Sequence, residues 1–320
     1  MLPISAGHGT SLGEEECRAM KILIVASHNK GYFAPFIEEQ AAALKRSGYE
    51  IEFFGVTGKG IKGYIAALSK LRKYIRSFKP DIVHAHYGLS GLLANLQRKV
   101  PVVTTYHGSD INEKSVLPFS RVAMRLSRFN IFVSQRTLEI AKPKKNYVLL
   151  PCGVDLNELQ LTTKSEARKR LGLAEDRKYV LFAGAFDNPV KNYPLAKDAM
   201  SKLPEAKLIE LKGYSRDEVT LLMCAADAIL MTSHTEGSPQ VIKESMACGC
   251  PVVSVDVGDV KELCGGIPGC FVCERSAKAL SDGLSAAFGY ERTEGRKRII
   301  ERGLSNDLTT TKIMSIYNNI

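Results

Sequence analysis

The chain has 320 residues, of which 45% are hydrophobic, and it carries 44 Lys and Arg against 34 Asp and Glu. This length is too great for one ordinary hydrophobic core and predicts two domains of about 150 residues each. No apolar run approaches the roughly 20 residues of a membrane span. The first nineteen residues lack the basic start and apolar core of a signal peptide. We therefore expect a soluble cytoplasmic protein, with residues 1–19 forming a disordered extension.

The positive charge is concentrated in the first half of the chain. Residues 21–150 hold 21 Lys and Arg but only 8 Asp and Glu, whereas residues 151–320 hold 22 Lys and Arg and 23 Asp and Glu. The densest basic stretch runs from Lys59 to Lys79. It suits an anionic membrane leaflet, which would place the protein peripherally on the inner face of the membrane, or an acidic acceptor; a solvated helix face is the equally weighted alternative. No nucleic-acid-binding motif accompanies the charge, so nucleic acid is not an expected partner.

Eight cysteines without an export signal indicate a reducing compartment rather than a disulfide scaffold. Cys270 and Cys273 have a zinc-like spacing, but they bracket an apolar segment. We therefore expect inert buried thiols and no metal site.

Two series of short apolar segments alternate with helical patterns along the chain. Continuous apolar strands of this kind are typical of parallel sheets covered by helices on both faces. Residues 156–177 are polar without a strand pattern and predict a linker with a short helix. The expected strands are 21–26, 50–56, 81–85, 101–105, 130–134 and 147–151 in the first series, and 179–184, 206–211, 228–233, 251–255 and 269–273 in the second.

Helices are predicted where apolar residues recur at intervals of three or four. This spacing predicts a helix over residues 37–44 and another over residues 65–75, which begins with Ile65 on its apolar face. A last amphipathic helix would place Leu308, Ile313 and Tyr317 on its apolar side.

The stretch "TEGSPQVIKESMACGCPVV" begins at Thr235, between two expected strands. Ser238 followed by Pro239 predicts a helix that begins with a serine cap and has proline at its first position. The amides of Gln240 and Val241 would then be free at the positive end of the helix, which favours phosphate.

Two glutamates flank this phosphate site. Glu244 lies six positions beyond the expected cap, or about 9 Å along the helix axis, where it can accept hydrogen bonds from a ribose diol. Glu236 precedes the helix and could accept hydroxyl protons on the other side. The pattern indicates a nucleotide diphosphate sugar, although either glutamate could also be a solvated residue.

The segment "EGSPQVIKESMACGCPVVS" closely resembles the signature of the retaining GT-B glycosyltransferases of family 4. The resemblance extends from Lys21 to the end through "YHGSD" at 106–110, "GVD" at 153–155 and "FAGAFDNPVKN" at 182–192. It implies an α/β GT-B fold, in which two Rossmann-like domains face each other across a cleft and a C-terminal helix crosses back to the first domain. The implied divisions are an acceptor domain (20–155), the linker (156–177), a nucleotide-sugar domain (178–300) and the crossing helix (301–320).

The resemblance also implies roles for individual residues. Glu236 would contact the transferred sugar, Lys191 would neutralise the diphosphate, and His107 would lie under the sugar ring. The implied binding residues are Glu244 for the ribose; Gly237, Ser238, Pro239, Gln240 and Val241 for sugar and phosphate; Gly31 for backbone approach to donor and acceptor; Gly213 and Tyr214 for the base; and Asp110 as an acceptor-binding or loop-fixing carboxylate.

One residue departs from the family pattern. The family usually has arginine after the glycine of the first loop of the nucleotide domain, whereas here Ala185 follows Gly184. A charge-assisted contact of this kind contributes about 1.5–3 kcal/mol. Arg216 and Lys212 are the cations nearest in sequence that could replace it.

The expected function is hexosyl transfer, with retention, from a nucleotide diphosphate sugar such as a UDP-sugar to a glycan or lipid-linked acceptor, in cell-surface polysaccharide or glycolipid synthesis. The resemblance implies a front-face route in which the leaving phosphate takes the acceptor proton. No cofactor is expected, and no Asp-x-Asp motif indicates an essential divalent metal. The alternatives are a catalytically silent sugar-nucleotide-binding protein, an NDP-sugar epimerase and a phosphorylase.

Overall fold

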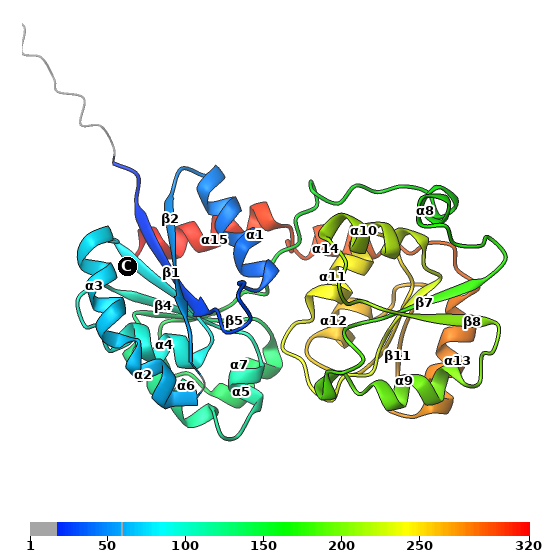
Figure 1. The fold of residues 1–320 in the computed structure, drawn as a ribbon, viewed down its shortest axis with the longest axis horizontal. Helices are drawn as coiled ribbons and strands as arrows, with labels where there is room; N and C mark the ends of the chain where they lie inside the picture. Colours follow the sequence, from blue (N-terminus) through cyan, green and yellow to red (C-terminus); the bar gives the residue numbers. More distant parts are fainter. Residues whose placement is uncertain (1–17, 59) are drawn as a thin grey trace, which may run out of the picture.

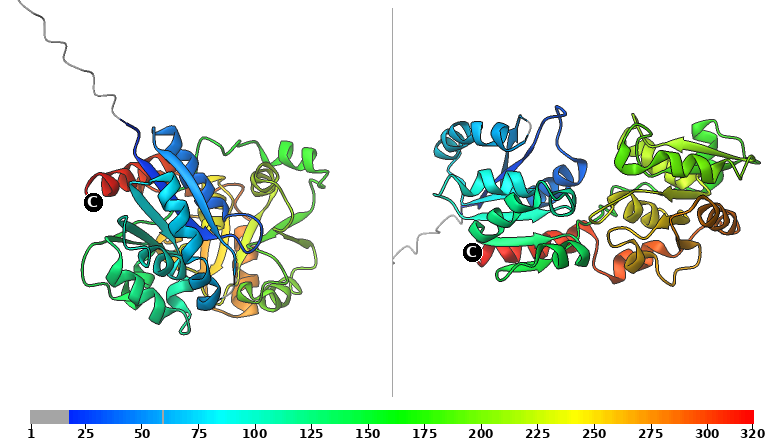
Figure 2. Two further views of the ribbon diagram at one scale, coloured as in Figure 1. Left: turned by 60° about the vertical axis from the view of Figure 1, so that its left-hand side comes forward. Right: turned by 90° about the horizontal axis from the view of Figure 1, so that it is seen from below.

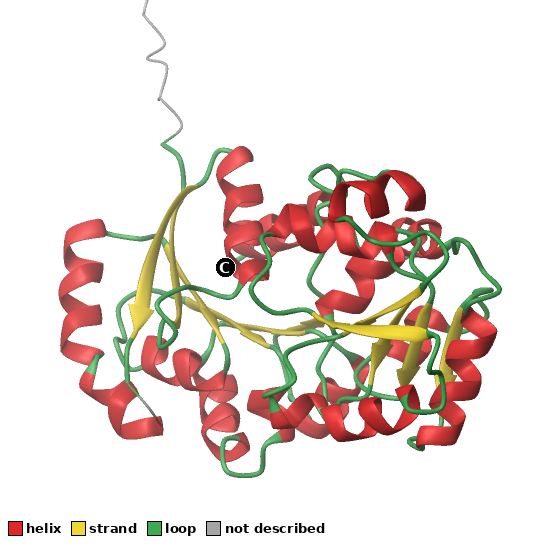
Figure 3. Ribbon diagram, turned by 45° about the vertical axis from the view of Figure 1, so that its right-hand side comes forward, coloured by secondary structure: helices red, strands yellow, loops and turns green. Residues whose placement is uncertain are grey.

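The computed structural model describes residues 18–58 and 60–320, so the extension expected over residues 1–19 lies almost wholly outside the described part. The protein has two lobes placed side by side (Figure 1). Each lobe is a sheet with helices on both of its faces (Figure 3). The chain therefore adopts the two-domain parallel architecture that the sequence predicts.

The first sheet has six parallel strands in the order β2-β1-β3-β4-β5-β6. The order reverses beside β1, which pairs with β2 on one side and β3 on the other. All six predicted strands are present, with shifted ends: β1 (Lys21–Ser27), β2 (Glu50–Val56), β3 (Ile82–His86), β4 (Val102–Tyr106), β5 (Phe129–Phe132) and β6 (Tyr147–Leu149).

Two apolar clusters cover the two faces of this sheet. One joins α1 to the last helix of the chain, through residues such as Leu44 and Ile313. The other joins α3 and α4 to the opposite face, through Leu71 and Leu93. The helices of the first domain are α1 (Pro35–Arg46), α2 (Gly60–Ala66), α3 (Leu68–Phe78), α4 (Gly88–Asn95), α5 (Ser109–Asn112), α6 (Leu117–Leu126) and α7 (Gln135–Ala141).

The single helix expected over residues 65–75 is wrong. The structure has two helices, α2 and α3, which meet at Ala67. The buried face runs through Tyr64, Ala67 and Leu71, so Ile65 points away from it and is 49% exposed. The predicted apolar face, which started from Ile65, is the row of residues next to the buried one.

The second sheet has five parallel strands in the order β11-β10-β9-β7-β8, and its predicted strands are likewise present. A single large apolar cluster surrounds it. Its strands are β7 (Lys178–Phe182), β8 (Ala206–Glu210), β9 (Ala228–Met231), β10 (Val252–Val255) and β11 (Cys270–Cys273); its helices are α8 (Lys164–Leu171), the 3-10 turn η1 (Pro189–Lys191), α9 (Tyr193–Met200), α10 (Arg216–Ala225), α11 (Gln240–Ala247), α12 (Val260–Cys264), α13 (Ala277–Ala287) and α14 (Gly295–Glu301).

The chain passes between the domains twice, and the two passages lie side by side. Val154 donates its N–H to Leu304 O and accepts from Asn306 N, both at 2.8 Å. The last helix, α15 (Asn306–Asn318), then lies on the first domain (Figure 2). The expected crossing helix is thus confirmed.

The expected apolar side of α15 is only partly correct. Ile313 and Tyr317 are buried against the first domain, but Leu308 is 48% exposed. The Tyr317 hydroxyl bonds to Nδ1 of the buried His84 on β3. An aromatic side chain and a buried polar contact therefore attach the end of the chain to the first sheet.

In the described residues, no helix is both long and apolar enough to cross a membrane. The seven described cysteines are free, and no group of three metal-binding side chains is found among the residues that the structure places. Cys270 and Cys273 are half-buried rather than buried, because they lie at the two ends of β11.

The attachment of α15 predicts a large stability effect. Replacement of Tyr317 by Ala should lower the free energy of unfolding by about 3–5 kcal/mol, because it opens a cavity and removes the partner of His84. Leu308→Ala on the same helix should change it by less than about 0.5 kcal/mol. Urea unfolding of the two variants makes the comparison, and equal effects would contradict the docking of α15.

Candidate donor and acceptor site

The carboxyl ends of both parallel sheets point toward the space between the domains, where open α/β sheets bind ligands. The loops that follow β7 and β9 come from the second domain. The loops that follow β1, β3 and β4 come from the first. The candidate site is built from these five loops.

The helix that carries the glutamate motif begins one residue later than expected. Pro239 is the N-cap of α11 and no side chain caps the helix, so the prediction of Ser238 as the cap is wrong. The Ser238 hydroxyl bonds instead to Oδ2 of Asp259 at 2.6 Å. Ile242 N–H donates to Pro239 O, which leaves the preceding amides of Gln240 and Val241 at the free first turn.

Lys191 and Glu236 lie in direct contact at the mouth of this helix. The Lys191 ammonium is 2.7 Å from Glu236 Oε1, and both side chains are about four-fifths buried. The stem of Lys191 lies over Gly184, where a Cβ would be 2.8 Å from its Cγ. The Thr232 hydroxyl donates to Lys191 O at 2.8 Å and so fixes the backbone of the Lys191 loop. Together with Gln240 and its neighbours, these groups border a cavity of about 310 Å³.

Glu244 is part of a charged contact that crosses between the domains. Arg216, at the start of α10, places Nη1 3.0 Å from Glu244 Oε1 and Nη2 2.7 Å from Glu39 Oε1 on α1. Burial raises the pKa of Glu244, and Arg216 opposes this rise. The carboxylate expected to hold a ribose is therefore already paired.

Glu39 is the second carboxylate of this contact. Burial raises its pKa to about 7; Arg216 lowers it, while Glu244, Glu158 and Asp155 raise it further. Glu39 therefore changes charge near neutral pH.

Backbone alone separates the two domains at the centre of the site. A Cβ on Gly237 would lie 2.0 Å from His107 O, and one on Gly108 would lie 2.5 Å from the Cα of Gly237. Asn112 on α5 extends this contact, because its side-chain amide donates to Thr235 Oγ1 at 2.8 Å and to Glu236 O at 3.2 Å. The predicted residues His107, Glu236 and Gly237 are thus brought together.

The imidazole of His107 belongs to a buried aromatic cluster of the first domain. Its Nε2 lies 3.0 Å from Nδ1 of His86, and its Nδ1 lies 3.9 Å from the Cys152 thiol. The ring also packs on Phe36 and Tyr87. Burial lowers the pKa of His107 to about 3, so the ring is neutral at pH 7.

Asp110 holds the loop that contains His107. Its carboxylate accepts from the backbone N–H groups of Gly88, His107 and Gly108 at 2.9–3.0 Å. Burial raises the pKa of Asp110 to about 6, although the hydrogen bonds from these backbone donors lower it. The geometry matches the loop-fixing alternative of the two that the sequence left open.

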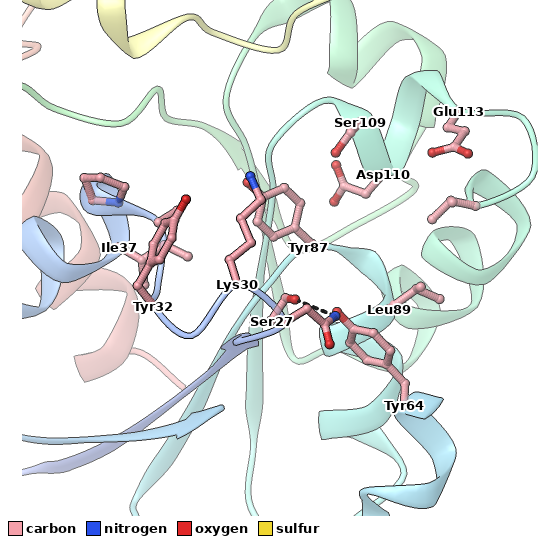
Figure 4. Close-up of a pocket in the computed structure, with 14 residues that line it drawn as sticks. Ser27, Lys30, Tyr32, Ile37, Tyr64, Tyr87, Leu89, Ser109, Asp110 and Glu113 are labelled. Atoms are coloured by element: carbon pink, nitrogen blue, oxygen red, sulfur yellow. Dashed lines mark hydrogen bonds between the residues drawn. The ribbon is translucent and has the colours of Figure 1, made fainter. Parts of the chain in front are cut away.

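A second cavity, of about 510 Å³, lies in the first domain on the other side of this loop. Its walls combine tyrosine rings with polar side chains, and Lys30 extends into its middle between Tyr32 and Tyr87 (Figure 4). Tyr64 and Asp110 lie on its far side. Such a mixture of aromatic faces and hydrogen-bonding groups is suited to a sugar.

The remaining predicted residues lie near these cavities without direct contacts that define a role. Gly31 has φ +80° in the loop whose neighbours line the larger cavity, and Gly213 has φ +83°. Tyr214 is 42% exposed. Of the two cations considered as replacements at position 185, Arg216 lies at Glu244, whereas Lys212 forms an exposed pair with Asp187.

The sequence did not indicate Glu39, Asn112 or Lys243 as parts of the site. Lys243 is fully buried on α11 and donates to Cys152 O at 2.6 Å, which ties the glutamate helix to the end of the first domain. All three make contacts over long separations along the chain, which local spacing does not reveal. The one signal in the sequence for such a contact was Lys243, a charged residue on the apolar side of a helix.

Comparison with known proteins agrees with this architecture. Residues 32–158 match the family described as Glycosyltransferase Family 4, and residues 195–288 match Glycosyl transferases group 1. TuaC of Bacillus subtilis, assigned to teichuronic acid biosynthesis as a glycosyltransferase, is 28% identical over 240 residues, which are 66% of this chain and 62% of TuaC. The matched part thus spans less than two thirds of that relative.

Solved structures show the same fold at low sequence identity. Sucrose-phosphate synthase of Thermosynechococcus elongatus superposes with a TM-score of 0.79 at 16% identity, covering 94% of this chain and 98% of that one. HepE of Anabaena in complex with UDP-glucose gives a TM-score of 0.72 at 16% identity, covering 94% and 100%.

Two facing parallel-sheet domains with a crossing C-terminal helix define the GT-B fold. Within this class, the chain belongs to the family 4 glycosyltransferases. The resemblance and the fold expected from the sequence are confirmed. The domain boundaries and the residue roles remain predictions.

The close approach of the two glycine loops predicts a kinetic defect. Gly237→Ala should push the His107 loop away and lower kcat/KM for sugar transfer about ten- to a hundredfold, which corresponds to the usual 1–3 kcal/mol of overpacking. Gly289→Ala, in the second domain away from the loops, is the matched control. Unchanged kcat/KM in the Gly237 variant would mean that the loops need not approach each other.

The raised pKa of Glu39 predicts a pH-dependent stability. The folded protein holds this proton more tightly than the unfolded chain, so stability should fall as pH rises from about 4.5 to 7, by up to about 3 kcal/mol. Glu39→Gln should flatten this decline while keeping an acceptor for Arg216. Unfolding of both proteins at pH 5 and pH 8 measures the difference, and parallel pH profiles would refute the assignment to Glu39.

Proposed function

We propose that the protein transfers a sugar, with retention of configuration, from a nucleotide diphosphate sugar to a glycan or lipid-linked acceptor. One observation carries the proposal: the Lys191–Glu236 pair lies beside the free amides of α11 and faces the His107 loop of the other domain. A cation, an open helix terminus and a carboxylate then surround the bond that must break.

The donor is proposed to lie along α11. Its diphosphate would take the Lys191 ammonium from Glu236 and accept from the amides of Gln240 and Val241, because both supply positive charge in a partly buried place. Glu236 would then be free to accept from hydroxyls of the transferred sugar. Glu244 would accept from the ribose, sharing this carboxylate with Arg216.

The transfer step follows from the same placement. The bond between the anomeric carbon and the β-phosphate oxygen breaks, and the acceptor oxygen bonds to that carbon from the same face. The leaving phosphate takes the acceptor proton, while Lys191 and the helix terminus stabilise the charge that develops on it. His107, neutral in its cluster, would support the sugar ring by packing.

The acceptor is proposed to occupy the cavity of about 510 Å³ in the first domain. Its tyrosine faces suit the apolar side of a sugar ring, and Lys30, Ser109 and Glu113 can bond to hydroxyls or to an acidic substituent (Figure 4). A glycan of a cell-surface polysaccharide or glycolipid fits this chemistry. The role of TuaC in teichuronic acid biosynthesis supports the first, and the UDP-glucose held by HepE supports a UDP-sugar as donor.

A peripheral position on the inner face of the membrane is proposed with this function. The described cations of the dense basic stretch, from Lys62 to Lys79, are exposed and form no ion pair among the residues that the structure describes. Anionic lipid headgroups attract such a surface.

Two other functions compete with this proposal. A catalytically silent protein is favoured by Ala185, where the family usually has arginine, and opposed by the Lys191–Glu236 pair. An epimerase on the same fold would release a changed sugar nucleotide or free sugar without an acceptor. The products of the reaction separate the three.

The experiment begins with a panel of UDP-, GDP- and ADP-sugars. A true donor at a hundred times its dissociation constant should stabilise the protein by about 2.7 kcal/mol in a thermal shift assay. Nucleotide release is then measured with and without oligosaccharide acceptors. Binding without turnover would favour the silent alternative.

Variants test the proposed roles with the selected donor. Lys191→Ala should lower kcat about a hundredfold or more, because it removes a charged group that stabilises the leaving phosphate. Glu244→Ala should weaken nucleotide binding about tenfold or more by calorimetry, through the loss of charge-assisted hydrogen bonds. The exposed residues Lys197 and Glu291, each replaced by Ala, serve as controls. A Glu244 variant with wild-type affinity would remove this residue from the ribose site.

A further inference from the structure

A second basic surface lies apart from the cleft, at the amino ends of β4, β5 and β6. Two hollows, of about 490 and 580 Å³, open there side by side and share Arg125 and Lys145 in their walls. Their walls contain eight Lys and Arg and no Asp or Glu: Arg98, Lys99, Arg121, Arg125, Arg128, Lys142, Lys144 and Lys145.

These eight cations are available for an external partner. All of them are exposed, and none forms an ion pair with a carboxylate within residues 18–58 and 60–320. Arginine and lysine on a folded surface are usually interspersed with acids, which neutralise their field. An unneutralised group of this size attracts anions.

Exposed apolar side chains accompany the charge. Val122 and Leu126 on α6 are each 41% exposed and alternate along the helix with Arg121 and Arg125. Cations mixed with exposed aliphatic side chains are typical of surfaces that lie in a membrane interface, whereas nucleic acid would gain little from valine and leucine.

The surface is connected to the acceptor cavity by one helix. Val116, the N-cap residue of α6, lines that cavity, and Arg125 at the end of α6 lines both hollows. Ten residues of helix span about 15 Å. In Figure 1, α6 lies on the lower side of the first domain.

Helix α3, which carries part of the dense basic stretch, borders the same surface. Arg72 donates to Leu96 O at 2.8 Å, next to Arg98 and Lys99 in the first hollow. One cation of α3 therefore lies beside the first hollow.

We propose that this surface, centred on the end of α6, docks the protein on an anionic phospholipid membrane, with headgroup phosphates in the two hollows. Docking holds the acceptor cavity about one helix length from the bilayer, within reach of a glycan carried on a lipid. The inference rests on the proposed peripheral position but not on the transfer chemistry, so vesicle binding and sugar transfer can fail separately.

Charge reversal of the two shared residues tests the proposal. Arg125→Glu with Lys145→Glu should weaken sedimentation with vesicles of 70% phosphatidylcholine and 30% phosphatidylglycerol at least tenfold at 0.1 M salt. Lys197→Glu with Lys202→Glu, an equal charge change at exposed sites of the second domain, should have less than a threefold effect. Equal losses in the two double variants would overturn the assigned surface and indicate net charge alone.

A second variant tests the apolar part. Val122→Ser with Leu126→Ser keeps every charge and should weaken vesicle binding at least threefold without changing binding to a fluorescent RNA oligomer. Binding of the wild-type protein to the RNA but not to the vesicles would overturn the membrane proposal in favour of nucleic acid. Nucleotide release from the donor should stay within twofold of wild type in both surface variants, and all variants should unfold at the wild-type temperature.

Discussion

The site depends on a contact between two stretches of backbone, at Gly108 in the first domain and Gly237 in the second. Neither position has room for even a Cβ atom. Because the loops meet there without side chains between them, the free end of α11 and the Lys191–Glu236 pair come directly against the first domain. If these two loops were farther apart, solvent would separate Lys191 from the acceptor cavity. Asn112, which bonds to Thr235 and to Glu236 O, reinforces the same approach.

Much of the fold could be predicted from sequence because its signals are local. Mostly apolar segments of five to seven residues separated by helical spacing specify a parallel sheet, and all eleven expected strands are present. The loop before α11 was recognisable from Pro239 and the two glutamates. Its start was misplaced by one residue because the Ser238 hydroxyl has a better partner in Asp259, twenty-one residues away. The break at Ala67 was missed because two adjacent apolar rows, through Tyr64 and through Ile65, compete for one face.

The remaining features of the site come from contacts between distant parts of the chain. Arg216 and Glu39 are 177 positions apart, and only the closure of two domains brings them within 2.7 Å. The contact of His107 with His86 likewise requires that β3 and β4 be neighbours in register. Residue spacing could select Glu244 and Glu236 as binding groups. It could not tell that each already has a cationic partner.

These pairings bear on the missing arginine at position 185. Lys191 is held by one carboxylate and Arg216 by two. In the proposed donor complex, a doubly charged diphosphate would bind by exchanging partners, and its gain would be the difference between its own contacts and those that Glu236 gives up. The Lys191–Glu236 pair is about four-fifths buried, so salt would weaken this exchange less than it weakens contacts between exposed charges, which are screened beyond about 10 Å at 0.1 M.

The two domains thus use charge in different ways. Between residues 151 and 320 acids and bases are nearly equal in number, and the Lys191–Glu236 pair is largely buried, which would favour a small anion at short range. In the first domain thirteen cations are in excess between residues 21 and 150, and those around α6 are exposed and unpaired in the described structure. Exposed excess charge provides little selectivity but a long-range attraction that salt weakens. The proposed donor recognition and the proposed docking to a large anionic surface would therefore depend on separate physical terms, and salt should weaken the docking more than the donor binding.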